Sequence, residues 1–215
     1  MSPEQVVNGE VAPVAVARLS GPVDRVAREL LGTLLLRRLD DQPVVARIVE
    51  TEAYGPDDPA SHSVAGPTPR CRSMFAAAGT AYVYRSYGVH WMLNVVVSPP
   101  GVGAAVLVRA AAVLDGQEVV RGHRPSVTAD HQLLRGPGCL GQGLDLDAVR
   151  HDGANLLDPD AELWLGTDGW RPAHGEVVAG PRVGVRHAAE VPWRFHLSGR
   201  PAVSAYRRSP RAPVR

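Results

Sequence analysis

Two acidic residues, Glu50 and Glu52, stand in the stretch R-I-V-E-T-E-A-Y, which alternates in the manner of a β-strand. Side chains two apart on a strand point the same way, so both acids are expected to share a face with Ile48 and Tyr54. That shared direction disfavours a glycosidase in which two acids flank the bond. One glutamate near aromatic rings could instead act as a general base on a water, oriented by a cation such as Arg109. An acid paired with arginine at a sheet edge explains the spacing equally well.

The tyrosines that follow the acids could hold a flat ring. In A-Y-V-Y-R-S-Y-G, Tyr82 and Tyr84 share one strand face, and Tyr87 precedes Gly88, where a turn could direct its ring outward. Half-buried sheet positions are the competing explanation, because tyrosine is common in strands. An exposed ring near arginines suits stacking on, or insertion between, nucleic-acid bases. The arginines nearby are Arg70, Arg72 and Arg85.

Composition limits the chemistry that is available. All 23 basic residues are arginine, so no lysine can form a Schiff base or serve a P-loop. A formal net charge of +1 excludes a strongly charged chain but allows a local basic face. Cys71 and Cys139 lie far apart without zinc-ligand spacing, so no metal site is expected. The sequence shows no signal peptide and no run of about 18 apolar residues, which predicts a cytoplasmic protein with reduced thiols.

The length of 215 residues and an apolar content of 45% fit one domain. We expect a loosely packed leader over 1–19, the domain over 20–205, and a tail rich in arginine and proline over 206–215. The periodicity from Val23 to Arg38 predicts an amphipathic helix, and Gly32 marks the expected break into a leucine-rich strand. A long loop over 55–80 contains a helical turn within 72–78, and another helix falls within 115–124. The glycines at 135–144 indicate either a close backbone approach or a tight turn, and their spacing favours the turn. The expected strands are 44–54, 81–88, 90–98, 103–113, 162–165, 181–185 and 193–197.

Several motifs occur in the order found in alkyladenine (3-methyladenine) DNA glycosylases, and the chain resembles that family over about residues 20–205. They are R-I-V-E-T-E-A-Y, D-P-A-S-H, T-P-R, M-F, G-T-A-Y-V-Y-R-S-Y-G, L-N-V-V-V, A-V-L-V-R-A, G-P-G-C-L, P-R-V-G-V and W-R-F. The resemblance implies an α+β (mixed α/β) fold, a single compact domain around a curved antiparallel sheet with peripheral helices. It also implies a monomer, associated with the nucleoid, that excises alkylated or deaminated purines from double-stranded DNA after base flipping and needs no cofactor.

The same resemblance implies roles for individual residues. Glu52 looks like the base that activates the water, and Arg109 looks like its positioning partner. Tyr54 would stack on one face of the flipped base, with His62 and Tyr84 on the other.

Three further positions complete the site that the resemblance implies. Tyr87 resembles the residue that wedges into the minor groove and fills the gap left by the flipped nucleotide. Asn94 matches the position that crowds the amino group of guanine, and the backbone near Val183 would help to hold the water. Arg70, Arg72 and Arg85 would contact DNA.

Two other classes of function remain open from the sequence. The chain could bind damaged or structured nucleic acid without cleaving it, although Glu52 and Arg109 together argue against this. It could also be a divergent hydrolase acting on RNA or on a free nucleoside. Because lysine is absent, we expect a monofunctional glycosylase without a lyase step.

Overall fold

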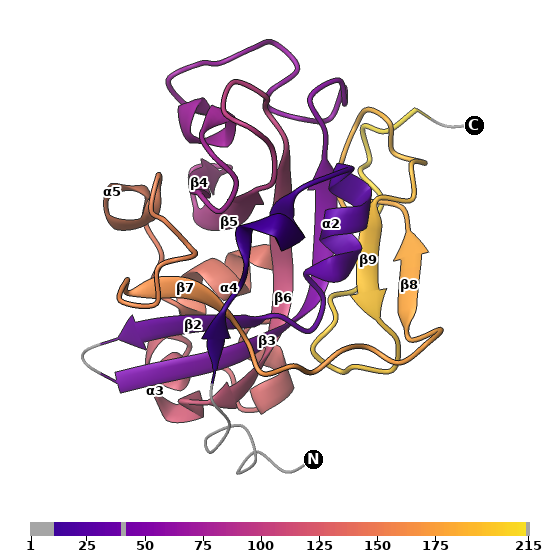
Figure 1. Ribbon diagram of the computed structural model, residues 1–215. Helices are drawn as coiled ribbons and strands as arrows, with labels where there is room; N and C mark the ends of the chain where they lie inside the picture. Colours follow the sequence, from indigo (N-terminus) through magenta and orange to yellow (C-terminus); the bar gives the residue numbers. More distant parts are fainter. Residues whose placement is uncertain (1–10, 40–41, 214–215) are drawn as a thin grey trace.

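Strand β3 (Gln42–Tyr54) is the centre of the molecule and carries both acidic residues. The structure is a computed structural model that describes residues 11–39 and 42–213. In this part of the chain, nine strands form one curved antiparallel sheet with the order β1-β7-β2-β3-β6-β5-β4, and a β9-β8 pair joins β3 (Figure 1). The other strands are β1 (Ala12–Pro13), β2 (Leu34–Leu39), β4 (Ala81–Ser86), β5 (His90–Val96), β6 (Ala105–Asp115), β7 (Leu163–Thr167), β8 (Val177–Gly180) and β9 (Arg194–Leu197).

One edge of β3 is shared by two partners. Its first half pairs with β2, its end pairs with β9, and the opposite edge pairs with β6 along most of its length. The register with β6 shifts between Ile48 and Glu50 and again between Glu50 and Thr51, and such bulges bend a strand. Ile48 therefore lies in the main apolar core, whereas the acids contact Arg109. The expectation that Ile48 shares a face with the acids is wrong for this reason.

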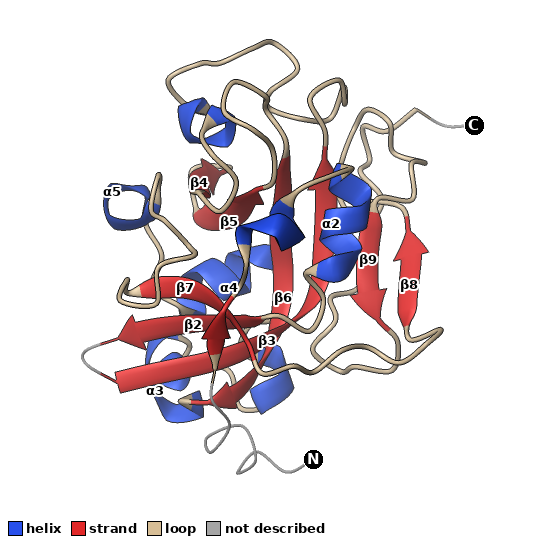
Figure 2. Cartoon of the chain, in the orientation of Figure 1, coloured by secondary structure: helices blue, strands red, loops and turns tan. Residues whose placement is uncertain are grey.

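Short helices surround the sheet, as Figure 2 shows. The α-helices are α2 (Val23–Glu29), α3 (Gln117–His123), α4 (Pro137–Gly143) and α5 (Ala148–His151), and the 3-10 helices are η1 (Val16–Leu19), η2 (Arg72–Phe75) and η3 (Asp130–Gln132). Helix α2 lies against β3, where the Thr51 hydroxyl donates to the carbonyl of Ala27 over 2.8 Å. The predicted break of this helix is confirmed, because Gly32 has a φ of 88° and β2 begins at Leu34.

The structure corrects three expectations. The glycines of 135–144 lie in or beside helix α4 instead of a tight turn. A Cβ at Gly141 would stand 2.1 Å from the Trp91 carbonyl oxygen of β5, which agrees with the alternative of a close backbone approach. No strand covers 181–185, because β8 ends at Gly180 and the buried side chain of Arg182 follows it. The leader is not loose over 11–19, where Val14 and Leu19 are buried in the core; residues 1–10 lie outside the described part.

Candidate active site

The two acids of β3 meet one arginine of the neighbouring strand. Glu50 and Glu52 both have no exposed surface, and Arg109 on β6 is 5% exposed. Arg109 Nε donates to Glu50 Oε1 over 2.8 Å, and Arg109 Nη1 lies 3.2 Å from Glu52 Oε2. Burial disfavours the cation, but Glu52 and Glu50 outweigh it and raise the pKa of Arg109. One guanidinium thus bridges both carboxylates, so the expected contact between Glu52 and Arg109 is present.

Glu50 accepts four hydrogen bonds from the protein, three at Oε1 and one at Oε2. Besides Arg109, it accepts hydrogen bonds from Arg194 Nε (2.7 Å) and from the backbone N–H (2.8 Å) and hydroxyl (2.9 Å) of Ser204. Burial would raise the pKa of Glu50, but Arg109 and Arg194 outweigh it and lower that pKa. A carboxylate with these partners has little capacity left for a water. Glu50 therefore holds β3, β6, β9 and the segment after β9 together.

Glu52 is held by different donors. The backbone N–H of Val183 donates to Oε1 over 2.7 Å, and the Tyr54 hydroxyl donates to Oε2 over 2.9 Å. Burial and then the charge of Glu52 raise the pKa of Tyr54, so this hydroxyl stays protonated and remains a donor. The two donors and Arg109 fix the plane of the Glu52 carboxylate. The structure therefore brings Glu52, Arg109, Tyr54 and Val183 into one contact set.

A second group is formed by aromatic side chains. The Tyr82 and Tyr84 rings stack with centroids 5.3 Å apart, and His62 meets Tyr84 edge-on at 4.6 Å. His62 Nδ1 lies 2.9 Å from the Tyr82 hydroxyl, and the Arg70 guanidinium lies 5.5 Å from the centroid of the Tyr84 ring. The family resemblance implies no individual role for Tyr82, although its position on the same strand face as Tyr84 was a signal for one.

These aromatic residues keep neutral forms near pH 7. Burial, followed by the charge of Glu52, raises the pKa of Tyr84 to about 12. Burial of one side of His62, followed by the charge of Arg70, lowers the pKa of His62, which keeps an exposed edge. A neutral imidazole and neutral phenols do not repel a cationic ring placed against them.

The carboxylates and the aromatic residues belong to one site. Tyr54, Phe75 and Tyr84 all contact the same small cluster of buried side chains, which consists of Cys71, Met74, Tyr82, Val96 and Ala105. The influence of Glu52 on the pKa of Tyr84 shows the same proximity. Cys71 is a free thiol whose sulfur lies 3.1 Å from the Thr68 hydroxyl, so it packs the loop beneath the rings. Asn94 is buried opposite Tyr82, and its Nδ2 donates to the Tyr82 carbonyl over 3.0 Å.

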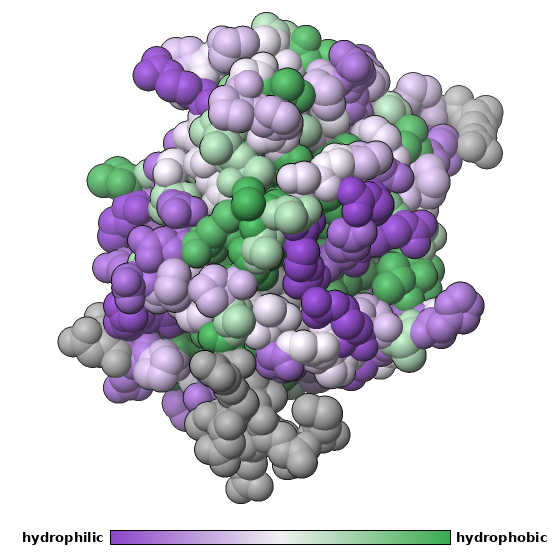
Figure 3. Space-filling model, in the orientation of Figure 1, coloured by the Kyte–Doolittle hydropathy of each residue, from purple (hydrophilic) through white to green (hydrophobic). Residues whose placement is uncertain are grey.

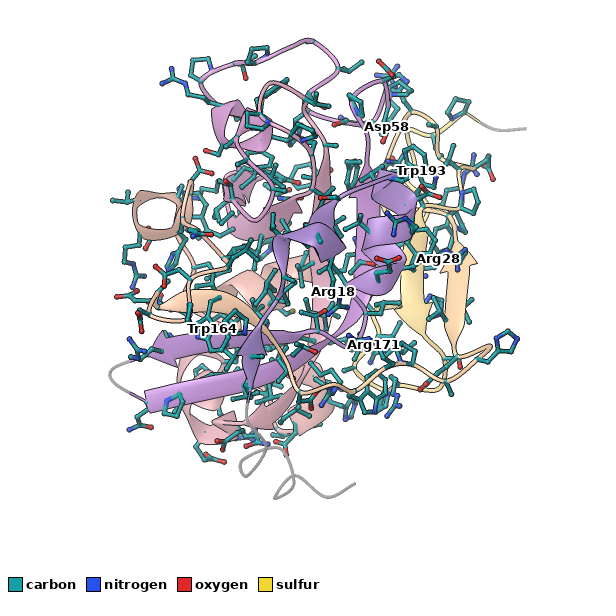
Figure 4. The ribbon with its side chains drawn as sticks, viewed as in Figure 1. Arg18, Arg28, Asp58, Trp164, Arg171 and Trp193 are labelled. Carbon is teal, nitrogen blue, oxygen red and sulfur yellow. The ribbon has the colours of Figure 1, made fainter. Side chains whose placement is uncertain are left out.

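Arg182 and Asp58 were missed by the sequence analysis. Arg182 is 1% exposed, and both of its terminal nitrogens donate to the carboxylate of Asp58 in the 55–80 loop. Its guanidinium lies 4.8 Å from the centroid of Tyr54 and 5.5 Å from that of Trp193. Figure 4 shows Asp58 and Trp193 close together beside α2. This buried pair joins the loop to the backbone that presents Val183 to Glu52.

The residues expected to contact DNA are spread over the surface. Tyr87 is 92% exposed in the turn between β4 and β5, with a φ of 49° that non-glycine residues seldom adopt. Arg72 is exposed in η2, Arg70 covers Tyr84, and the Arg85 guanidinium lies 5.6 Å from the centroid of the Trp91 ring. The structure therefore places Arg70 against the aromatic group, whereas the Arg85 guanidinium lies against Trp91 and Arg72 is exposed in η2.

Two findings concern other kinds of site within the described ranges 11–39 and 42–213. No helix there is long and apolar enough to cross a membrane. No three His, Cys, Asp or Glu side chains there are grouped so that they could hold a metal ion.

Comparison with known proteins places this geometry in a family. Three relatives each bear the name "Putative 3-methyladenine DNA glycosylase". The relative from Nocardia farcinica is 47% identical over 209 residues, covering 94% of this chain and 96% of the relative. The relative from Rhodococcus jostii is 48% identical over 210 residues, covering 93% and 88%. The relative from Nitrosospira multiformis is 44% identical over 185 residues, covering 86% and 90%.

The sequence profile described as "Methylpurine-DNA glycosylase (MPG)" matches residues 17–201, which include every residue of the contact sets around Glu52 and Tyr84. The resemblance expected from the motifs is therefore confirmed. With this match and relatives that align over most of its length, the chain belongs to the methylpurine-DNA glycosylase family and is a DNA glycosylase.

Proposed function

We propose that this glycosylase flips alkylated purines, 3-methyladenine above all, and deaminated purines out of double-stranded DNA and hydrolyses their N-glycosidic bond with a water activated by Glu52. One observation carries the proposal: Glu52 is completely buried, yet it is oriented by Val183, Tyr54 and Arg109 beside the aromatic cluster. A carboxylate fixed in this way can take a proton from a water in a single direction. Glu50 has no such capacity, because four protein donors already occupy it.

The aromatic residues hold the flipped base in this scheme. Tyr54 contacts one face, and His62 and Tyr84 contact the other. An alkylated purine such as 3-methyladenine carries positive charge and leaves without an added acid, so a single general base is sufficient. Cation–π attraction to the rings contributes about 0.5–2 kcal/mol, which is too little to reject normal bases alone. Crowding by Asn94, intact base pairing and the poorer leaving group of a normal base supply the remaining selectivity.

Contact with the duplex involves the exposed side chains around the site. Tyr87, at 92% exposure, inserts at the place vacated by the flipped nucleotide. Arg70, Arg72 and Arg85 contact phosphates, and the enzyme acts as a monomer. Because lysine is absent from the sequence, no side-chain Schiff base forms, and the product keeps an intact abasic strand.

The test uses two duplexes, one with a single hypoxanthine and one methylated to give 3-methyladenine. Wild-type protein followed by alkali should cleave at the lesion. Glu52→Gln should lose roughly a factor of 10²–10⁴ in excision rate and still bind the lesion. The matched control is Glu118→Gln, since the Glu118 side chain is 85% exposed. Binding of both duplexes without excision by wild type would favour the non-catalytic module, and borohydride-trappable crosslinks would contradict the monofunctional mechanism.

A further inference from the structure

A cavity of about 490 Å³ lies between η1, α2 and the segment that leads into β8. Its charged walls come from Arg18, Arg28, Glu29 and Arg171, with His174 at the same rim. Figure 4 shows Arg18, Arg28 and Arg171 on one face of the molecule, and Figure 3 shows hydrophilic side chains gathered around α2 on that face. This volume falls in the range of small-molecule sites.

The cavity lies on the opposite face of the sheet from the catalytic glutamate. Thr51 contacts α2, whereas its neighbours Glu50 and Glu52 contact Arg109 on the other side. Strand β9 shows the same two faces. Phe195 pairs with Thr51, and the centroid of its ring lies 4.5 Å from the guanidinium of Arg28, which lines the cavity. A base bound beside Glu52 therefore cannot reach the cavity, so a ligand of the cavity would be distinct from the flipped base.

The positive charge of the cavity is not neutralised by the described residues. Three guanidinium groups face one carboxylate, Glu29, which is already bound by Arg25 over 2.8 Å. Arg18 Nη2 donates to the backbone carbonyl of Glu29 over 2.7 Å. The other terminal nitrogen of Arg18, Nη1, is buried and has no hydrogen-bond partner in the part of the chain that the structure describes. Among the residues that the structure describes, Arg171 donates to the Trp170 carbonyl and the Thr167 hydroxyl alone. Burial and the proximity of Arg171 also lower the pKa of Arg18, as expected for crowded cations.

We propose that this cavity binds a small molecule that carries a dianionic phosphate group. Guanidinium groups match the geometry of phosphate oxygens, and three of them line this cavity. Two excess positive charges suit a phosphate monoester, whose second pKa is about 6, better than the singly charged diester of DNA. The cavity has room beyond one phosphate, and Leu31 and Val177 line it with apolar surface for an organic substituent.

The test measures thermal unfolding of the full chain with inorganic pyrophosphate or phenyl phosphate, at an ionic strength kept constant with sodium chloride. Both probes should raise the melting temperature of the wild type in a saturable way, since they bind the folded state. Arg18→Gln and Arg171→Gln should each weaken calorimetric binding about tenfold or more. Arg124→Gln is the matched control from outside the cavity and should bind as the wild type does. Should Arg18→Gln fail to fold, Arg171→Gln carries the test, because its side chain makes only two local hydrogen bonds.

Two results would overturn the inference. One is a melting temperature that rises no more with pyrophosphate than with sodium chloride of equal ionic strength. The other is a loss of affinity for lesion-free duplex in the Arg171 variant without any response to pyrophosphate, which would assign the cations to the DNA backbone. Excision by Arg171→Gln should equal that of the wild type, so failure here is distinguishable from failure of the proposed catalytic role of Glu52.

Discussion

Replacing Glu50 by glutamine tests whether Glu50 mainly stabilises the fold while Glu52 acts in catalysis. Glu50 is fully buried and accepts from Arg109, Arg194 and both donors of Ser204. Glutamine keeps the shape, removes the charge and turns one acceptor into an NH₂ group that faces these donors. Breaking a buried pair by removing one charge costs about 3–5 kcal/mol. For a chain of this size, each kcal/mol lowers the melting temperature by about 2–4 °C.

Glu52→Gln provides the contrast. In this variant Arg109 remains paired with Glu50, the Val183 N–H can still donate to an amide oxygen in the place of Oε1, and the Tyr54 hydroxyl can accept from an NH₂ group in the place of Oε2. We expect a loss of about 1–3 kcal/mol in the free energy of unfolding, together with the loss of excision. Compared with Glu52→Gln, the Glu50→Gln variant should lose more free energy of unfolding. Its excision rate, assayed well below its melting temperature, should fall less than that of Glu52→Gln.

Urea and thermal unfolding of both variants measure stability, and single-turnover excision of hypoxanthine measures activity. Glu118→Gln on the exposed face of α3 serves as the control for loss of a carboxylate. The reasoning is refuted if Glu50→Gln unfolds at the wild-type midpoint. It is also refuted if Glu52→Gln loses the most stability and still excises the base.

Three further predictions concern the surroundings of the site. Tyr87→Ala should change stability by less than about 0.5 kcal/mol, since the ring is 92% exposed, but should slow excision from duplex more than from single-stranded DNA; equal effects on both would contradict the wedge. Asp58→Asn leaves the buried charge of Arg182 without its partner and should cost about 3–5 kcal/mol in chemical unfolding, whereas an unchanged midpoint would disprove the structural role of the pair. Because the pKa of Glu50 is lowered from 4.5, its stabilisation is complete above about pH 4.5 and is lost as the pH falls through the folded-state pKa. The free energy of unfolding should thus fall more steeply below pH 4.5 in wild type than in Glu50→Gln, and parallel pH profiles would argue against it.

Much of the fold followed from local patterns. The break near Gly32 was predictable because a glycine interrupts the helical periodicity and a leucine-rich strand follows. The helix that contains the glycines of α4, by contrast, was not predictable from local patterns. Their spacing allows a turn or a close backbone approach, and the contact of this helix with the Trp91 carbonyl identifies the close approach as the reason for glycine there. The segment 181–185 was read as a strand because valines alternate in it, but the buried pairing of Arg182 with Asp58 places it in a loop.

The sequence by itself determined the family, the absence of lysine chemistry and the residue types of the site, because these depend on identities and on motifs in order. The resemblance already points to Glu52 as the base, but only the tertiary structure shows how the two acids differ in their hydrogen-bond partners. Glu50 and Glu52 are equivalent by strand spacing, but a bulge in β3 and the donors brought by β9, Ser204 and Val183 give them different partners. Those donors come from residues more than 100 positions away along the chain, and hydrogen bonds across such distances leave no trace in local periodicity.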